Sequence, residues 1–535
     1  MNVTRTPLYF GPDARALFGW YHAPADGRQR ELAIVICPPL GHEYVNSHRS
    51  ERHLADALAR AGIPALRFDY DGTGDSAGDD EDPARVAAWS ASIGTAMTTL
   101  RALAHAPRIG LLGIRLGATL AAAVAAERDD VDCLVQWAPV RGRAYARELK
   151  ALHLTGINRD AVSTDGSIEP GGFVVTEETQ RDLGALSPGA PRTTRVLTLG
   201  ERFDEMFLPP HSAVVPHDAI ARTVDQLIAW SGDAMQCAQP IGALRETATF
   251  GDARESFVRF DGIFGIASEP SSRKSDAPAI LLVNAGSTHH VGPNRLYVHV
   301  ARALAQAGFR TLRFDLPGLG DSVIDDVARE NDPYLPESSD VLADVVARLH
   351  APRVVLAGVC SGAHASFHAA AGLASAPIVE SIVINPLTFD YQRGMSLDQP
   401  TTSYSEWQRY LRSMRTLAGW KRLFRRETPL STIVRTVIDR ARLLAKPKKG
   451  DPTIERNLRA IVGAGRQLTF VFSQFDPGYE LLMLGAGPTV RALRKEGRIA
   501  LWRIANATHT FESKATREVM IASLREHLTR RYAST

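Results

Sequence analysis

The sequence predicts an α/β protein with two domains in tandem, each built on a mostly parallel, doubly wound sheet. Two observations lead to this prediction: a long internal repeat, and the alternation of apolar strands with amphipathic helices in each copy. Residues 34–76 align without a gap with residues 280–322, with 18 identities in 43 positions. The offset of 246 residues is the length of a whole domain. A chain of 535 residues is also too long for one hydrophobic core.

Both copies repeat the same elements in the same order. Continuous apolar strands that alternate with helices are typical of a parallel sheet covered on both faces. We place the domain boundary near residue 235, which gives a first copy at 1–235 and a second copy at 236–535. The expected elements are a strand (33–37 and 279–283), a helix (52–62 and 298–308), a second strand (64–69 and 310–315), a turn with glycine and aspartate (71–76 and 317–322) and a third strand (108–113 and 353–358).

Composition and charge are those of an ordinary globular protein. Apolar residues make up 44% of the chain and charged residues 23%, and the formal net charge is +3. This charge gives no argument for a nucleic-acid partner. The four cysteines are scattered with no CxxC pair, so we expect no disulfide framework and no structural zinc site. We also expect no other metal and no cofactor. The sequence shows no signal peptide and no apolar run of the ~18–20 residues that span a bilayer, and we expect a cytoplasmic protein.

The third strand of the second copy runs into "GVCSGA", residues 358–363. A G-x-nucleophile-x-G sequence between a strand and a helix is the nucleophile elbow of α/β-hydrolases. The frame of Gly358 and Gly362 places Cys360 at the apex. Ser361 is the alternative nucleophile, but its flanks would include the β-branched Val359. We therefore assign Cys360 as the nucleophile.

An oxyanion hole and a triad follow from the same fold. The backbone N–H of Ser361 is one expected donor, and the loop after the first strand supplies the other, Gly286 or, alternatively, Ser287. An acid and a histidine should follow late strands, in that order. Asp476 in "FSQFDPG" and His509 in "NATHTF" meet this expectation.

The first copy has Arg115 in "GIRLGA" where the second copy has Cys360. A guanidinium stays protonated and cannot attack a substrate. Asp204, His211 and His217 are acid and histidine candidates in this copy, but we expect no covalent catalysis. Two interpretations remain open: a scaffold in which Arg115 pairs with a local carboxylate such as Asp204, or a site in which Arg115 binds a carboxylate or phosphate ligand.

These motifs resemble the α/β-hydrolase superfamily. Within it, the two halves resemble the pair of hydrolase-like proteins associated with bacterial exosortase A systems: "PPLGHEYVNSHR" and "GIRLGA" match one type, "GVCSGA" and "FVFSQFDPG" the other. The resemblance covers roughly 30–235 and 250–530. It implies the hydrolase fold and site, and less about the substrate. Dienelactone hydrolases and polyhydroxyalkanoate synthases also carry a cysteine elbow. The resemblance to them implies that a thiol at this position can support either hydrolysis or acyl transfer.

An insertion at about 387–465 is expected to form a helical cap over the second site. Its basic stretch includes Arg422, Arg425 and Arg426. We consider a solvated basic face, docking of acyl carrier protein or coenzyme A, and contact with an anionic membrane surface.

The sequence thus predicts a cytoplasmic bacterial hydrolase of an ester or thioester with an acyl-Cys360 intermediate, or an acyltransferase, acting on a small or carrier-bound acyl substrate. The alternative is a non-catalytic binding or scaffold protein. No oligomeric state follows from the sequence.

Overall fold

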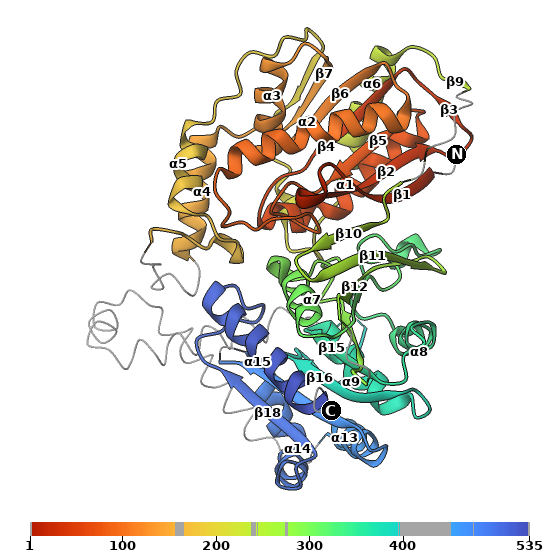
Figure 1. Ribbon diagram of the computed structural model, residues 1–535, viewed down its shortest axis with the longest axis vertical. Helices are drawn as coiled ribbons and strands as arrows, with labels where there is room; N and C mark the ends of the chain where they lie inside the picture. The colour runs from red at the N-terminus through yellow and green to blue at the C-terminus, as the bar shows by residue number, and fades with distance from the viewer. Residues whose placement is uncertain are drawn as a thin grey trace. The chain divides into compact units, whose positions relative to one another are not determined.

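The computed structural model describes residues 3–155, 165–236, 242, 244–272, 276–393, 395, 451–474 and 476–532 (Figure 1). The chain forms two compact units. Unit 1 comprises Met1–Ala277, Ser287–Pro333 and Glu512–Thr535, and unit 2 comprises Pro278–Gly286 and Tyr334–Phe511. Unit 1 therefore holds the first copy together with several elements of the second. The boundary near residue 235, which follows from the repeat, stays a prediction.

A seven-stranded sheet forms the centre of the first copy, in the order β1-β2-β5-β4-β6-β7-β8. The strands from β5 to β8 are parallel, and β1 and β2 add an antiparallel edge that the sequence analysis did not predict. The strands are β1 (Val3–Phe10), β2 (Leu17–Pro24), β4 (Leu32–Cys37), β5 (Ala65–Phe68), β6 (Arg108–Ile114), β7 (Val131–Trp137) and β8 (Val196–Leu199), and β3 (Arg28–Gln29) pairs with β9 (Met235–Gln236). The helices are α1 (His42–Arg60), α2 (Arg85–Ala104), α3 (Leu116–Glu127), α4 (Gly142–Thr155), α5 (Glu177–Ala185) and α6 (His217–Ser231).

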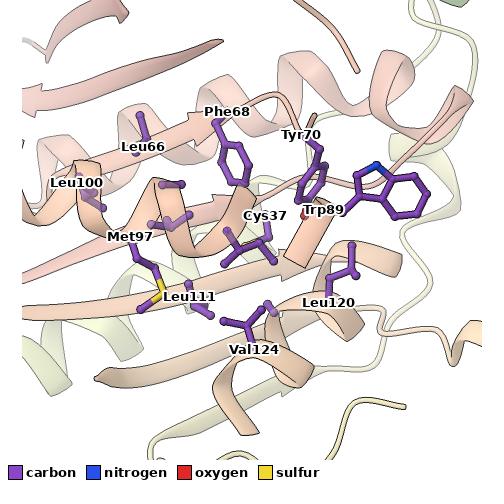
Figure 2. Close-up of a cluster of buried hydrophobic side chains, with 14 of the residues drawn as sticks. Cys37, Leu66, Phe68, Tyr70, Trp89, Met97, Leu100, Leu111, Leu120 and Val124 are labelled. Atoms are coloured by element: carbon purple, nitrogen blue, oxygen red, sulfur yellow. The ribbon is translucent and has the colours of Figure 1, made fainter. Parts of the chain in front are cut away.

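Strand β4 shows why this sheet is buried on both faces. Its residues are all apolar, and alternate side chains point to opposite faces of the sheet. Val35 packs into a cluster with α2 and α3, whereas Ile34 packs into a cluster with α1 and α6. Figure 2 shows the first of these clusters, which contains Phe68 and Leu111 of the strands and Met97 of α2.

The remaining elements of unit 1 come from the second copy. Strands β10, β11, β12 and β14 neighbour each other in that order and are antiparallel. Tyr9 and Trp20 of the first copy pack with Phe264 and Ile266 of the second in one buried cluster. The elements are β10 (Thr247–Phe250), β11 (Ala253–Phe260), β12 (Ile263–Pro270), α7 (Leu296–Gln306), β14 (Thr311–Phe314) and α15 (Lys514–Tyr532).

Unit 2 is built on five parallel strands that neighbour each other in the order β13-β15-β16-β17-β18. The strands are β13 (Ala279–Val283), β15 (Val354–Val359), β16 (Ile378–Ile384), β17 (Gln467–Ser473) and β18 (Ile499–Ile504), and the helices are α8 (Ser338–Arg348), α9 (Ser361–Gly372), α13 (Pro452–Gly463) and α14 (Gly478–Lys495). Because the strands are parallel, β15, β17 and β18 end at the same edge, and the predicted catalytic residues follow these three strands.

The repeat is visible in the glycine- and aspartate-containing turns. In the first copy the Asp75 amide donates to the Asp69 carboxylate over 2.8 Å, and in the second the Asp321 amide donates to Asp315 over 3.0 Å. The equivalent turns are thus held by equivalent hydrogen bonds.

The predicted cap at 387–465 falls largely outside the described residues, because residues 396–450 are not among them. Arg422, Arg425 and Arg426 lie in that gap, so the cap and its partners stay predictions. Among the residues that the structure describes, no helix combines the length and apolar character needed to cross a membrane.

Candidate active site

Cys360 lies at a sharp turn between β15 and α9. Its backbone has φ 60° and ψ −117°, which is strained for a residue with a Cβ. Both flanking glycines are required by close packing. A Cβ at Gly358 would lie 2.3 Å from the backbone of Gly362, and one at Gly362 would lie 2.4 Å from the Val283 carbonyl oxygen. Cys360 therefore occupies the apex of the elbow, where the side chain projects from the edge of the sheet toward a substrate.

His509 and Asp476 come together as the order of the strands suggests. The His509 Nδ1 atom lies 2.5 Å from Asp476 Oδ2, and the Asp476 carboxylate is buried. The other ring nitrogen, Nε2, is buried. Burial alone would lower the pKa of His509, but the Asp476 carboxylate, and to a lesser degree the charge of the nearby Cys360 sulfur, raise it well above its usual value. The arrangement therefore favours the imidazolium form of His509 beside the sulfur.

Asn385 holds the loop that carries His509 by a hydrogen bond, and the sequence analysis did not identify this residue. This fully buried residue follows β16 with φ 47°. Its side-chain amide donates to the His509 carbonyl over 2.7 Å and to Ser473 Oγ over 2.8 Å, and its oxygen accepts from the Ser473 amide. Asn385 thus ties the loops after β16, β17 and β18 together. No motif spacing marks this role.

Ser361 and Gly286, the predicted oxyanion donors, lie next to each other. Ser361 is the first residue of α9, so its own N–H has no acceptor within the helix. The Gly286 N–H donates to Ser361 Oγ over 2.9 Å, and that hydroxyl also lies 3.4 Å from the Asn284 carbonyl. In this structure the Ser361 side chain therefore occupies the amide that the sequence analysis assigns to the hole. Ser287, the alternative donor, contacts the Asn331 carbonyl through its hydroxyl.

A cluster of aromatic side chains includes Tyr334, which lies near Cys360. The Tyr334 ring stacks on Tyr391 at 4.2 Å and meets the edge of His364, one helical turn after Cys360. Burial raises the pKa of Tyr334, and the charge of the nearby Cys360 raises it further. Burial and the neighbouring His368 lower the pKa of His364 to about 3, so its imidazole is neutral. The sequence analysis did not identify these residues. The four-residue spacing of Cys360 and His364 would have placed both on one face of the helix.

The elbow of the first copy has the same backbone and different chemistry. Arg115 has φ 54° and ψ −119°, close to the values of Cys360. Its guanidinium donates to Glu43 over 2.8 Å and to Glu148 over 2.5 Å. The local carboxylates are thus Glu43 and Glu148 rather than Asp204. An anionic ligand would have to displace one of them, and anion binding at Arg115 stays a prediction.

The other candidates of the first copy lie on its surface segments. Asp204 pairs with Arg202 at 3.4 Å, and both side chains are exposed. His217 begins α6 and packs edge-on against His53, and His211 lies in the loop before it. These residues add no nucleophile to the turn at Arg115.

Comparison with family models identifies both halves. The model for serine aminopeptidases of the S33 group matches residues 33–164, and the model of the alpha/beta hydrolase family matches residues 280–519. The chain is a tandem of two α/β-hydrolase domains. Their sheets are mostly parallel, as the sequence predicted, so the fold prediction is confirmed.

Several solved structures are similar to part of the chain at low identity. Dienelactone hydrolase from Anabaena variabilis is 14% identical and covers 52% of this chain and 99% of its own, with a TM-score of 0.31. A thioesterase domain from the curacin biosynthetic pathway is 15% identical, with 52% and 99% covered and a TM-score of 0.30. Proline iminopeptidase from Mycobacterium smegmatis is 13% identical, with 52% and 98% covered and a TM-score of 0.30. No curated protein matches the chain significantly.

Proposed function

We propose that the second hydrolase domain cleaves an ester or thioester through an acyl intermediate on Cys360. The observation that carries this proposal is the His509–Asp476 pair, with Nδ1 and Oδ2 2.5 Å apart, near a thiol at the apex of a strained elbow. A nucleophile, a base and a group that orients the base are the parts that acyl transfer needs.

The reaction takes place in two steps. His509 takes the Cys360 proton, and the sulfur attacks the acyl carbon. The tetrahedral oxyanion then collapses, and the alcohol or thiol leaves with the proton held by His509. In the second step His509 takes a proton from water, the hydroxide attacks the acyl carbon of the Cys360 thioester, and the carboxylic acid leaves as the thiol is restored.

The oxyanion needs donors at both stages. The Ser361 N–H at the start of α9 is one of them. The Gly286 N–H donates a hydrogen bond to the Ser361 hydroxyl over 2.9 Å. Once this bond breaks, the N–H can serve as the second donor to the oxyanion. A small rotation of the Ser361 side chain would release this amide toward the substrate oxygen.

If an alcohol, amine or thiol replaces water in the second step, the enzyme is an acyltransferase. We propose coenzyme A or an acyl carrier protein as acyl donor in that case, in a cytoplasmic setting. The rival function is a non-catalytic scaffold of two hydrolase domains, which the Arg115 elbow of the first domain would suit.

Mass spectrometry after incubation of the full chain with p-nitrophenyl acetate or acetyl-coenzyme A tests these proposals. We expect an acetyl adduct on the peptide that contains Cys360, and its loss in Cys360→Ala. Ser361→Ala is the matched control and should still form the adduct, because it keeps the backbone N–H. An adduct on Ser361, or no adduct and no turnover with any acyl donor, would refute the cysteine mechanism.

A further inference from the structure

The segment directly after Gly286, residues 287–295, is held by the first copy. Within unit 1, His290 is fully buried and bridges two carboxylates, with Nδ1 2.8 Å from Asp315 and Nε2 2.8 Å from Asp75. Asp315 belongs to the second copy and Asp75 to the first. Although burial disfavours the charged ring, the two carboxylates raise the pKa of His290 to about 10. His290 is therefore a charged link between the copies at neutral pH.

His289 adds a second contact to the first copy. Its ring lies flat on His48 of α1, with the centroids 4.1 Å apart and the planes at 10°. The Tyr44 hydroxyl lies 3.3 Å from His289 Nε2 and donates to the Asp69 carboxylate over 2.6 Å. Tyr44 and His48 both belong to α1, and Asp69 lies just before the 71–76 turn. The first copy thus contacts His289 through two residues of α1.

Arg295, the last residue of the 287–295 segment, binds the 72–78 turn of the first copy. Its buried guanidinium makes four hydrogen bonds to carbonyl oxygens of the glycine-containing turn of the first copy. Since each carbonyl belongs to the backbone, this contact recognises the shape of the turn rather than a particular side chain. The four acceptors and their distances are Gly72 (3.0 Å), Gly74 (2.8 Å), Ser76 (2.6 Å) and Gly78 (2.8 Å).

Gly286 has no side chain that could hold it in place. It has φ 60°, and a Cβ added there would meet no atom within 4 Å. The hydrogen bond that its N–H donates to Ser361 Oγ must break for the amide to serve an oxyanion. The position of this amide is then set by the chain on either side. On the C-terminal side the chain enters the 287–295 segment at the next residue.

We propose that the first domain is a positioning partner that holds the oxyanion loop of the catalytic domain, through the contacts of Asp75, His48 and the 72–78 turn with residues 289–295. This inference rests on the proposed function of Cys360. It assigns a role to a domain whose own apex residue, Arg115, cannot attack a substrate. Asp75 and Arg295 are positioning residues, because they act on the reaction only through the Gly286 amide.

Hydrogen exchange of the full chain, followed by mass spectrometry on peptides that cover 284–295, tests the anchoring without requiring turnover. Asp75→Asn removes the charge that His290 binds, and Arg295→Met removes the four bonds to the turn. We expect exchange in 284–295 to rise about tenfold or more in both variants. Arg295→Lys keeps the charge and part of the bonding and should recover part of the protection.

Kinetics with p-nitrophenyl acetate complete the test. Because loss of one oxyanion donor costs roughly 10²–10³ in kcat, a poorly held donor should lower kcat about ten- to hundredfold, with KM changed less than about twofold. The matched control is Asp132→Asn, which breaks ion pairs with Arg108 and Arg195 elsewhere in the first domain. We expect it to leave both the exchange of 284–295 and kcat within about twofold of the wild type.

Two results would overturn the inference. One is wild-type exchange of 284–295 in both Asp75→Asn and Arg295→Met. The other is faster exchange with an unchanged kcat. A wild type that forms no acyl adduct would refute the proposed function instead, and the exchange measurement would still decide whether the first domain holds the loop.

Discussion

Arg67 and Asp321 form a buried ion pair, although Arg67 belongs to the first copy and Asp321 to the second. The same pair occurs with the copies exchanged, because Arg313 pairs with Asp75. Residues 67 and 313 are equivalent in the repeat, as are 75 and 321. A contact in which each partner supplies the same two groups is the pattern of a twofold interface between identical subunits. Unit 1 therefore holds such an interface within one chain.

The first prediction concerns the stability of this contact. Removing one partner leaves a buried charge unpaired, so Arg67→Met should lower the free energy of unfolding by about 3–5 kcal/mol. The double variant Arg67→Met/Asp321→Leu should lose less than the sum of the two single variants. Urea unfolding of the full chain measures the cycle. The exposed pair Arg192–Asp129 is the control, and breaking it should cost about 1 kcal/mol or less. Additive single effects at Arg67 and Asp321 would contradict the prediction.

The fold was largely predictable because the repeat and the apolar strands are local signals. β4 and β13 are continuous apolar runs, and the two glycines around Cys360 mark the elbow by spacing alone. The partners of His509 differ in this respect. Asp476 follows a strand, as the fold leads one to expect, whereas Asn385 reaches His509 across 124 residues with no spacing rule to reveal it.

Two other features of the fold leave no pattern in the sequence. The antiparallel strands β1 and β2 are fully paired, but their sequence mixes polar and apolar residues, so periodicity alone did not separate them from a loop. The hydrogen bond from Gly286 to Ser361 Oγ depends on the rotamer of one side chain. Sequence patterns report burial and turn geometry, and they do not report rotamers.

The second prediction tests the elbow with two glycines of the same helix, α9. Gly362→Ala should abolish folding or activity, because its Cβ would lie 2.4 Å from the Val283 carbonyl oxygen. Gly372→Ala is the matched control, since a Cβ there meets nothing within 4 Å. Soluble yield and thermal unfolding of the full chain check both. An active, stable Gly362→Ala variant would show that the strand and helix are farther apart than described.

The third prediction concerns pH. The folded pKa of His509 lies above its unfolded value of about 6.5, so its contribution to stability is full below that pH and is lost as the pH rises through the folded pKa. His509→Gln should therefore destabilise the chain more at about pH 6 than at about pH 10. Thermal unfolding at both pH values measures this. In an Asp476→Asn background the pH dependence should shrink, because the carboxylate that raises the pKa is gone. An effect of His509→Gln that grows with pH would contradict the assignment.

The fourth prediction concerns Asn385. Asn385→Leu keeps the approximate volume and removes the hydrogen bonds to Ser473 and to the His509 carbonyl. We expect kcat for p-nitrophenyl acetate to fall about tenfold and stability to fall by about 1–3 kcal/mol, since the buried partners lose their bonds. Thr388→Val in the same loop is the control, because its hydroxyl bonds locally, donating to the Asp390 carbonyl and accepting from the Asp390 amide. Equal losses of kcat in both variants would mean that Asn385 acts on the loop in general and not on His509.

The last prediction concerns Tyr334, whose hydroxyl lies close enough to Cys360 for the charge of the sulfur to raise its pKa. A hydroxyl that donates to a sulfur anion stabilises it, and the anion is the form that reacts with alkylating agents. Tyr334→Phe should therefore slow iodoacetamide alkylation of Cys360 about three- to tenfold at neutral pH, a range typical of one lost hydrogen bond. The ring and its 4.2 Å stack on Tyr391 remain, so thermal stability should change little.

Peptide mapping by mass spectrometry separates Cys360 from the other cysteines. Tyr391→Phe is the matched control and should react at the wild-type rate. If Tyr334→Phe reacts as fast as the wild type while Cys360 is still alkylated, the hydroxyl has no influence on the sulfur, and Tyr334 serves only to pack against His364 and Tyr391.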